Sequence, residues 1–112
     1  MNRQTLIKSL VMGVVPLLAT AALAQQPAAL DGKALFNEKC AMCHNASGMG
    51  TGLLARRVDP AVAELEKRSD LTAAYVVRAA RVGILNMMPI TRADASDAQL
   101  AAVAGYLSKG KP

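Results

Sequence analysis

Apolar positions with helical spacing are clearest near the C-terminal end of the chain. The run Ser96-Asp97-Ala98-Gln99 is a capping box, in which the serine and glutamine side chains bond backbone groups of a helix's first turn. After it, four apolar residues recur at intervals of three and four and so share one helical face. They are Leu100, Val103, Ala104 and Leu107. The pattern predicts a final helix that begins after Ser96.

Three further helices are predicted upstream, each from a residue that caps its first turn. Aspartate is a fair N-cap and stands at positions 31, 59 and 70. Proline follows the second aspartate at the first helical position, and glycine ends the third helix. The helices predicted from these signals cover residues 31–40, 60–68 and 71–82, capped by Asp31, Asp59 and Asp70.

The remaining segments are predicted as loops. Residues 45–52 are rich in glycine, and Pro89 blocks a helix through residues 84–95. No run alternates between apolar and polar residues with a period of two, so no sheet is expected. The predicted fold class is therefore all-α.

The N-terminal pattern differs from the rest and predicts an export signal over residues 1–24. Arg3 and Lys8 form a positive start that contains no acid, and an uncharged apolar stretch runs from Leu10 to Leu23. Ala22-Leu23-Ala24 is a small-x-small cleavage site. The apolar stretch is shorter than the roughly 20 residues that a membrane-spanning helix needs. The alternative is an uncleaved membrane anchor.

Charge and composition narrow the function classes for the remaining domain, residues 25–112. The chain has 112 residues and a net charge of +5, and removing the signal takes away 24 residues and two cations. The remaining net charge of +3 is small and scattered along the sequence, and no aromatic residues are interleaved with the cations. These two features exclude nucleic-acid binding. Two cysteines are too few for a disulfide scaffold. We expect one small periplasmic domain with no membrane span after signal removal. A domain of this size has a small core, which favours stabilisation by a covalent cross-link or a cofactor.

The run Cys40-Ala41-Met42-Cys43-His44 carries the candidate chemistry. C-x-x-C-H is the attachment pattern of c-type haem. Two thiols three residues apart on one helical turn reach two vinyl groups on one porphyrin edge, and His44 then lies under the ring with a nitrogen at the iron. The alternatives are a redox disulfide, which would need the strands of a thioredoxin-like fold, a zinc site, which would lack a fourth soft ligand, and chance. The run predicts one covalent haem.

Four methionines of the domain are candidates for the sixth position on iron. Met42 lies inside the attachment motif, and Met49 follows in the Gly-rich loop, where a packing or surface role fits better. Met87 and Met88 lie about 44 residues after His44, far enough to reach the opposite face of the ring. A thioether there would give His/Met ligation, which favours reduced iron. The alternative for such a methionine is core packing.

Further residues extend this pattern along essentially the whole domain. They are Gly32-x-x-x-Phe36, the haem motif and the Gly-rich loop after it, Tyr75 on a helix that ends in Gly83, Met88-Pro89, and Gly105-Tyr106-Leu107. The pattern resembles the class I c-type cytochromes, which are small single-haem electron-transfer proteins. The resemblance implies a cytochrome c-type fold of about four short helices wrapped around one covalent haem c.

The resemblance also assigns roles to particular residues. It implies attachment of the haem at Cys40 and Cys43 and axial ligation by His44 and Met88, with Met87 as the neighbouring alternative. It further implies that the first and last helices cross through a small residue and two aromatic rings, here Gly32, Phe36 and Tyr106. One departure is that Leu53 follows Gly52 where the family often has Gly-Pro, so a backbone acceptor for the His44 ring is expected without a known identity.

A narrower pattern lies in Leu54-Ala55-Arg56-Arg57, Arg68-Ser69-Asp70-Leu71 and Arg81-Val82-Gly83-Ile84. It resembles the small cytochrome subunit of 4-cresol-dehydrogenase-type flavocytochromes. In those enzymes a flavin subunit oxidises a phenol and passes single electrons to the cytochrome. This resemblance implies a flavoprotein dehydrogenase subunit as the partner.

The expected function is periplasmic single-electron transfer between redox partner proteins. A filled sixth position leaves no place for a substrate, so an electron carrier and not an enzyme is expected. The alternatives are a cytochrome subunit of a flavin-dependent dehydrogenase and a gas- or peroxide-responsive haem protein. At least one of Arg56 and Arg57 is expected to pair with a haem propionate. Six cations could steer an acidic partner, namely Lys33, Lys39, Lys67, Arg78, Arg81 and Arg92.

Overall fold

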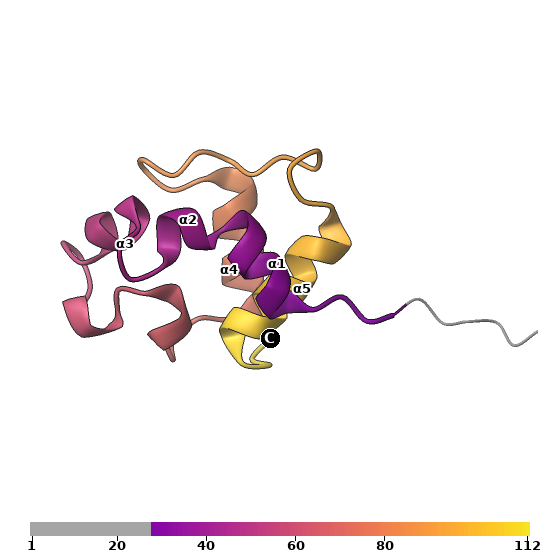
Figure 1. The fold of residues 1–112 in the computed structure, drawn as a ribbon, viewed down its shortest axis with the longest axis horizontal. Helices are drawn as coiled ribbons and strands as arrows, with labels where there is room; N and C mark the ends of the chain where they lie inside the picture. Colours follow the sequence, from indigo (N-terminus) through magenta and orange to yellow (C-terminus); the bar gives the residue numbers. More distant parts are fainter. Residues whose placement is uncertain (1–27) are drawn as a thin grey trace, which may run out of the picture.

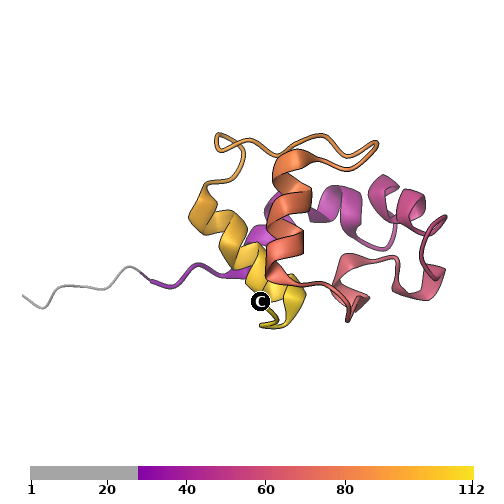
Figure 2. The same ribbon diagram turned by 180° about the vertical axis from the view of Figure 1, so that it is seen from behind.

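Five short α-helices and two 3₁₀ turns make up the part of the chain that the computed structural model describes, residues 28–112 (Figures 1 and 2). No strand occurs in this range, which confirms the predicted all-α class. The predicted signal peptide, residues 1–24, lies outside the described residues. Within residues 28–112, no helix is long and apolar enough to cross a membrane. The elements are α1 (Gly32–Lys39), α2 (Ala41–His44), α3 (Met49–Leu54), η1 (Pro60–Val62), η2 (Leu65–Lys67), α4 (Ala73–Val82) and α5 (Asp97–Ser108).

The first and last long helices cross at very close range. α1 packs against α5, and Figure 1 shows the two side by side although they lie at opposite ends of the domain's sequence. A Cβ atom on Gly32 would come within 2.2 Å of the Ala102 carbonyl oxygen, so only glycine allows this approach. Beside it, the rings of Phe36 and Tyr106 lie 6.1 Å apart at 48°. The crossing through Gly32, Phe36 and Tyr106 is therefore confirmed.

The hydrophobic core lies at this crossing. Phe36 is completely buried, and burial of a ring of this size contributes about 1.5–3 kcal/mol. α4 also packs against α5. The buried side chains of the cluster come from α1, α5 and the segment before α4, and they are Leu35, Phe36, Leu71, Val103 and Leu107.

The caps of α1 and α5 follow the predictions. The Asp31 carboxylate accepts hydrogen bonds from two backbone N–H groups in the first turn of α1, at 2.9 and 3.1 Å. Ser96 and Gln99 form the predicted capping box of α5, with bonds of 3.2 and 2.9 Å. These caps fix where each helix begins, and so they set the register in which α1 and α5 meet.

The prediction of a loop over residues 45–52 is wrong, because α3 begins inside that segment. Gly48 stands at its N-cap, and a Cβ atom there would lie 2.3 Å from the Cys43 carbonyl oxygen. The glycines thus allow the chain to fold back closely against α2, and this packing outweighs their poor helix propensity.

The single helix predicted over residues 60–68 is two 3₁₀ turns instead. Asp59 caps the first turn as predicted, accepting from the Ala61 N–H group at 2.9 Å. Glu64 then adopts an extended backbone with ψ of 129°. Because of this break, Ala63 is buried and Leu65 packs against the core cluster.

The predicted cap of α4 is also wrong. Asp70 is engaged by the Arg68 guanidinium through two hydrogen bonds of 2.8 and 2.5 Å, which lower the pKa of Asp70 to about 2. Thr72 caps the helix in its place, accepting from the Tyr75 N–H group at 3.2 Å. The helix therefore begins at Ala73, two residues later than predicted.

Polar contacts join the segment around η2 to the end of α5. The Tyr106 hydroxyl donates to the Glu66 carboxylate, and this bond raises the pKa of Tyr106 to about 12. The Lys109 ammonium donates to the Arg68 carbonyl oxygen at 2.6 Å. These bonds hold residues 64–70 against the helix that forms half of the core crossing.

The crossing of α1 and α5 yields a paired prediction on two glycines. Gly32→Ala should lower the free energy of unfolding by about 1–3 kcal/mol, because the helices must separate to admit the methyl group. Gly105→Ala on α5 is the control, since a Cβ atom there meets nothing within 4 Å, and it should raise the free energy of unfolding by up to about 1 kcal/mol. Urea unfolding measures both. Equal stability of the two variants would refute the close crossing.

Candidate functional site

A large apolar cavity opens between α2, α3, α4 and the loop that follows α4. Its volume is about 700 Å³, within the range of sites that hold cofactors. One part of its wall comes from the C-x-x-C-H motif and another from the loop over residues 84–90. Core residues also line it, including Leu71, Val103 and Leu107, so the cavity and the core share one surface.

Cys40 and Cys43 lie at the junction of α1 and α2. The Cys40 N–H group donates to the Phe36 carbonyl oxygen at 2.9 Å, so the thiol position follows from the buried ring of the core. The N–H group of Cys43 in turn donates to the Cys40 carbonyl oxygen at 3.1 Å. Both thiols are free and half-buried, and both residues line the cavity. Burial raises the pKa of the Cys40 thiol, which keeps it protonated at neutral pH.

His44 ends α2 and lines the same cavity. Burial lowers the pKa of His44, so its imidazole is neutral at pH 7, the form that binds metals. A backbone acceptor for the ring was expected, but the structure shows none, because Nδ1 is buried without a hydrogen-bond partner. Gly50 packs against that edge of the ring instead. A Cβ atom on Gly50 would lie 3.0 Å from Cε1 and 3.2 Å from Nδ1 of His44.

Of the four methionines considered, three border the cavity. Met87 and Met88 line it from the loop after α4, and Met49 lines it from α3. The Met88 side chain is 79 % exposed, whereas Met87 is half-buried. Met42 is 85 % exposed and is not part of the cavity wall.

The turn that presents Met87 and Met88 is narrow. Ile84 and Met87 exchange two backbone hydrogen bonds of 3.1 and 2.9 Å, and Leu85 between them has φ of 54°. Gly83, with φ of 79°, lets the chain leave α4 so tightly that a Cβ atom there would lie 2.5 Å from the Met87 carbonyl oxygen. The chain therefore turns back over the cavity immediately after α4.

Cations at the cavity differ from those expected. Arg56 and Arg57 are both exposed, and only Arg57 is in the wall. Lys39 and Arg68 are also in the wall and were not predicted as site residues. The Arg68 guanidinium is hydrogen-bonded to the Asp70 carboxylate. The only sequence feature that could have indicated this ion pair is that the two residues lie two positions apart.

The comparisons with known proteins agree with this geometry. Residues 27–107 match the family described as cytochrome c oxidase, cbb3-type, subunit III. The chain belongs to this family of c-type cytochrome domains. No curated protein and no solved structure matches the chain. The family supports haem-based electron transfer, and the helical fold agrees with it.

The residues at the cavity fit a c-type haem. The cavity is apolar and large, two thiols stand one helical turn apart in its wall, and a neutral imidazole follows them directly. His44 lines the cavity beside these thiols, and its Nδ1 atom is buried without a hydrogen-bond partner among residues 28–112. Among residues 28–112, no group of three or more His, Cys, Asp and Glu side chains is arranged to hold a metal ion.

The packing of Gly50 on His44 yields a prediction about this c-type cytochrome. Gly50→Ala should lower the free energy of unfolding by about 1–3 kcal/mol and reduce the yield of haem-containing protein, because the methyl group would also meet the Cys43 carbonyl oxygen at 2.7 Å. Gly52→Ala is the matched control in the same helix, where a Cβ atom has open space. The haem absorbance per milligram of purified protein measures the yield. Equal yields from both variants would contradict the close contact.

Proposed function

We propose that this protein carries single electrons in the periplasm through one haem c, attached to Cys40 and Cys43 and ligated by His44 and Met88. The observation that carries the proposal is the meeting of these four residues at one apolar cavity in a member of a c-type cytochrome family. Bound there, the haem would supply a one-electron couple between ferrous and ferric iron.

Covalent attachment is supported by the position of the two thiols. Cys40 and Cys43 are one turn apart, and both belong to the wall of a cavity large enough for a porphyrin. Thioether bonds at these sulfurs would fix one edge of the ring against α2. Because Cys40 follows directly from α1, attachment would also tie the cofactor to the core.

Axial ligation is supported from two separate segments. His44 offers a neutral imidazole from α2, and Met88 offers a thioether from the loop about 44 residues later. The two thus come from different parts of the cavity wall. With both positions filled, no site for a substrate is left on the iron, which supports an electron carrier.

Of Arg56 and Arg57, we propose that Arg57 is the residue that pairs with a haem propionate. Arg57 belongs to the cavity wall, whereas Arg56 does not. The guanidinium group can bind a carboxylate through two parallel hydrogen bonds. Arg68 lines the same cavity, but its guanidinium already binds the Asp70 carboxylate through two hydrogen bonds, which leaves Arg57 as the better partner.

Export to the periplasm is supported by the sequence pattern of residues 1–24 alone. The positive start, the apolar stretch and the Ala22-Leu23-Ala24 site together favour cleavage before Gln25.

A stable complex with a flavoprotein dehydrogenase subunit is the second candidate function. It is favoured by large apolar side chains at the cavity and beside it, with Leu85 73 % exposed, Val82 61 % exposed and Met88 79 % exposed. Most of the six cations expected to steer an acidic partner are paired with carboxylates of the described residues. Lys39, Lys67, Arg81 and Arg92 are already in ion pairs, and within residues 28–112 only Lys33 and Arg78 of the six expected cations have none.

The proposed haem site is tested with paired methionine variants of the haem-loaded protein. Met88→Ala should abolish the thioether-to-ferric-iron charge-transfer band and allow the reduced protein to bind carbon monoxide. Met87→Ala is the control and should retain the band.

Covalent attachment is tested by denaturation. In the wild type, the haem should remain on the denatured chain, whereas the double variant Cys40→Ala, Cys43→Ala should release it. Loss of the band in Met87→Ala alone would transfer the ligand role to Met87, and extractable haem in the wild type would refute attachment.

Size-exclusion chromatography of the protein from its native source distinguishes the carrier from the subunit. Haem and flavin absorbance are followed together. The carrier predicts haem eluting alone at the size of a single small domain, because no permanent partner is needed. Haem that elutes with a much larger flavin-containing protein would instead establish the second candidate.

A further inference from the structure

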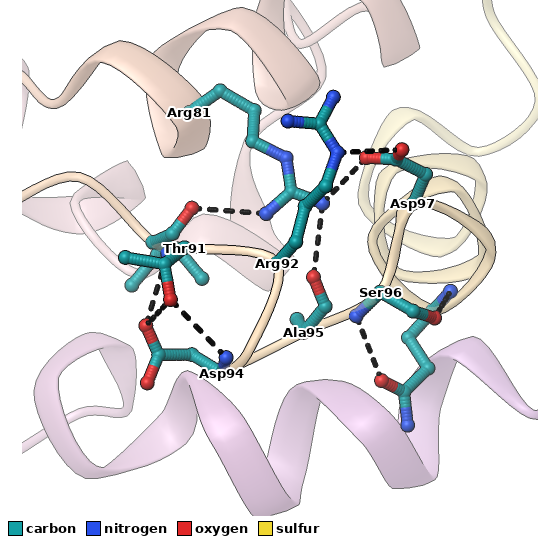
Figure 3. Close-up of polar contacts among 9 residues, drawn as sticks. Arg81, Thr91, Arg92, Asp94, Ala95, Ser96 and Asp97 are labelled. Carbon is teal, nitrogen blue, oxygen red and sulfur yellow. Dashed lines mark hydrogen bonds and ion pairs between the residues drawn. The ribbon is translucent and has the colours of Figure 1, made fainter.

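One arginine joins the loop of the proposed methionine ligand to two helices. Arg81 lies in the last turn of α4, and its side chain is only 16 % exposed. Its Nη1 atom donates to the Ile90 carbonyl oxygen at 2.9 Å, and its Nη2 atom donates to the Ala95 carbonyl oxygen at 2.9 Å. Nη2 also donates to the Asp97 carboxylate on α5 at 2.8 Å (Figure 3).

Ile90 is the point at which this network anchors the loop. Its N–H group donates to the Ala80 carbonyl oxygen at 2.8 Å, and its carbonyl oxygen accepts from Arg81. Both the N–H group and the carbonyl oxygen of Ile90 are therefore hydrogen-bonded to residues of α4. At the other end, Ile84 and Met87 are held by their mutual backbone bonds. Met88 lies between these two fixed points, one residue after the first and two residues before the second.

The other polar side chains of the loop do not reach α4. Thr91 and Asp94 bond each other at 2.7 Å within one turn, and Arg92 bonds the Asp97 carboxylate at 2.9 Å from a position that is 76 % exposed (Figure 3). Within residues 28–112, Arg81 is the only side chain that hydrogen-bonds the loop to α4. Hydrogen bonds from a charged donor to partly buried carbonyl oxygens are among the stronger ones in proteins.

We propose that Arg81 is a positioning residue for the sixth ligand, because its fork of hydrogen bonds to Ile90 and Ala95 holds the loop that carries Met88 over the cavity. This inference rests on the proposed His44 and Met88 ligation. Without the fork, the loop between Met87 and Ala95 opens more often, and the thioether leaves the iron more often. An exogenous ligand such as carbon monoxide then competes more easily for the vacated position.

The test uses the haem-loaded protein with Arg81→Gln, Arg81→Lys and the matched control Arg92→Gln. Arg81→Gln should weaken the thioether charge-transfer band and raise the apparent affinity of the reduced protein for carbon monoxide about tenfold, the effect of one lost charged hydrogen bond. Arg81→Lys keeps the charge but can replace only part of the fork, so it should lie between Arg81→Gln and the wild type. Arg92→Gln removes the exposed bond to Asp97 and should match the wild type.

Hydrogen exchange of backbone amides separates positioning from a general loss of stability. In Arg81→Gln, the Ile90 amide should exchange about tenfold faster, while the amides of Phe36 and Val103 in the core should keep their wild-type rates. Equal acceleration at all three would overturn the proposal, since Arg81 would then serve only the fold. If Arg81→Gln does not accumulate, Arg81→Lys decides by the same two measurements.

The outcomes also separate this inference from the proposed function. A wild-type protein without the thioether band would refute the His44 and Met88 ligation, and the role of Arg81 with it. A wild-type protein with the band, together with an Arg81→Gln variant of unchanged band and unchanged carbon monoxide affinity, would overturn the role of Arg81 alone.

Discussion

The close crossing of α1 and α5 at Gly32 determines where the candidate haem site lies. Any side chain at Gly32 would push the helices apart, because a Cβ atom there would meet the Ala102 carbonyl oxygen at 2.2 Å. The crossing buries Phe36, and the Phe36 carbonyl oxygen accepts the hydrogen bond of the Cys40 N–H group. Because α1 leads directly from the crossing to Cys40, the packing of α1 on α5 fixes the position of the C-x-x-C-H motif.

The core is small, and the cavity takes up much of the space that a larger core would fill. Leu71, Val103 and Leu107 belong both to the buried cluster and to the cavity wall. A bound porphyrin would therefore cover apolar surface of the core itself and complete the packing of these side chains. A cofactor that binds only the folded state stabilises that state by mass action. Such binding would compensate for the small core of a domain with only one phenylalanine and no tryptophan.

The sequence predicts those features that depend on local chemistry. The caps of Asp31 and Ser96 and the loop through Pro89 each follow from neighbouring residues, and each is found as predicted. The errors occur where a distant or competing contact decides. The helix α3 forms in a glycine-rich run because the glycines pack on the Cys43 carbonyl oxygen, and Asp70 fails to cap α4 because Arg68 binds it first.

The two sides of the cavity are built from different kinds of structure. The side of His44 is formed by helices that continue directly from the core, so its geometry changes only if the fold changes. The side of Met88 is a loop whose apolar side chains are at most half-buried, because Leu85 and Met88 are largely exposed and Met87 and Ile90 are only partly covered. Its position depends on a tight turn after Gly83 and on polar bonds to backbone carbonyl groups. Substitutions in this loop would therefore change how Met88 is presented to the cavity while the core crossing and the C-x-x-C-H motif remain intact. Under the proposed ligation by Met88, they would also change the reduction potential.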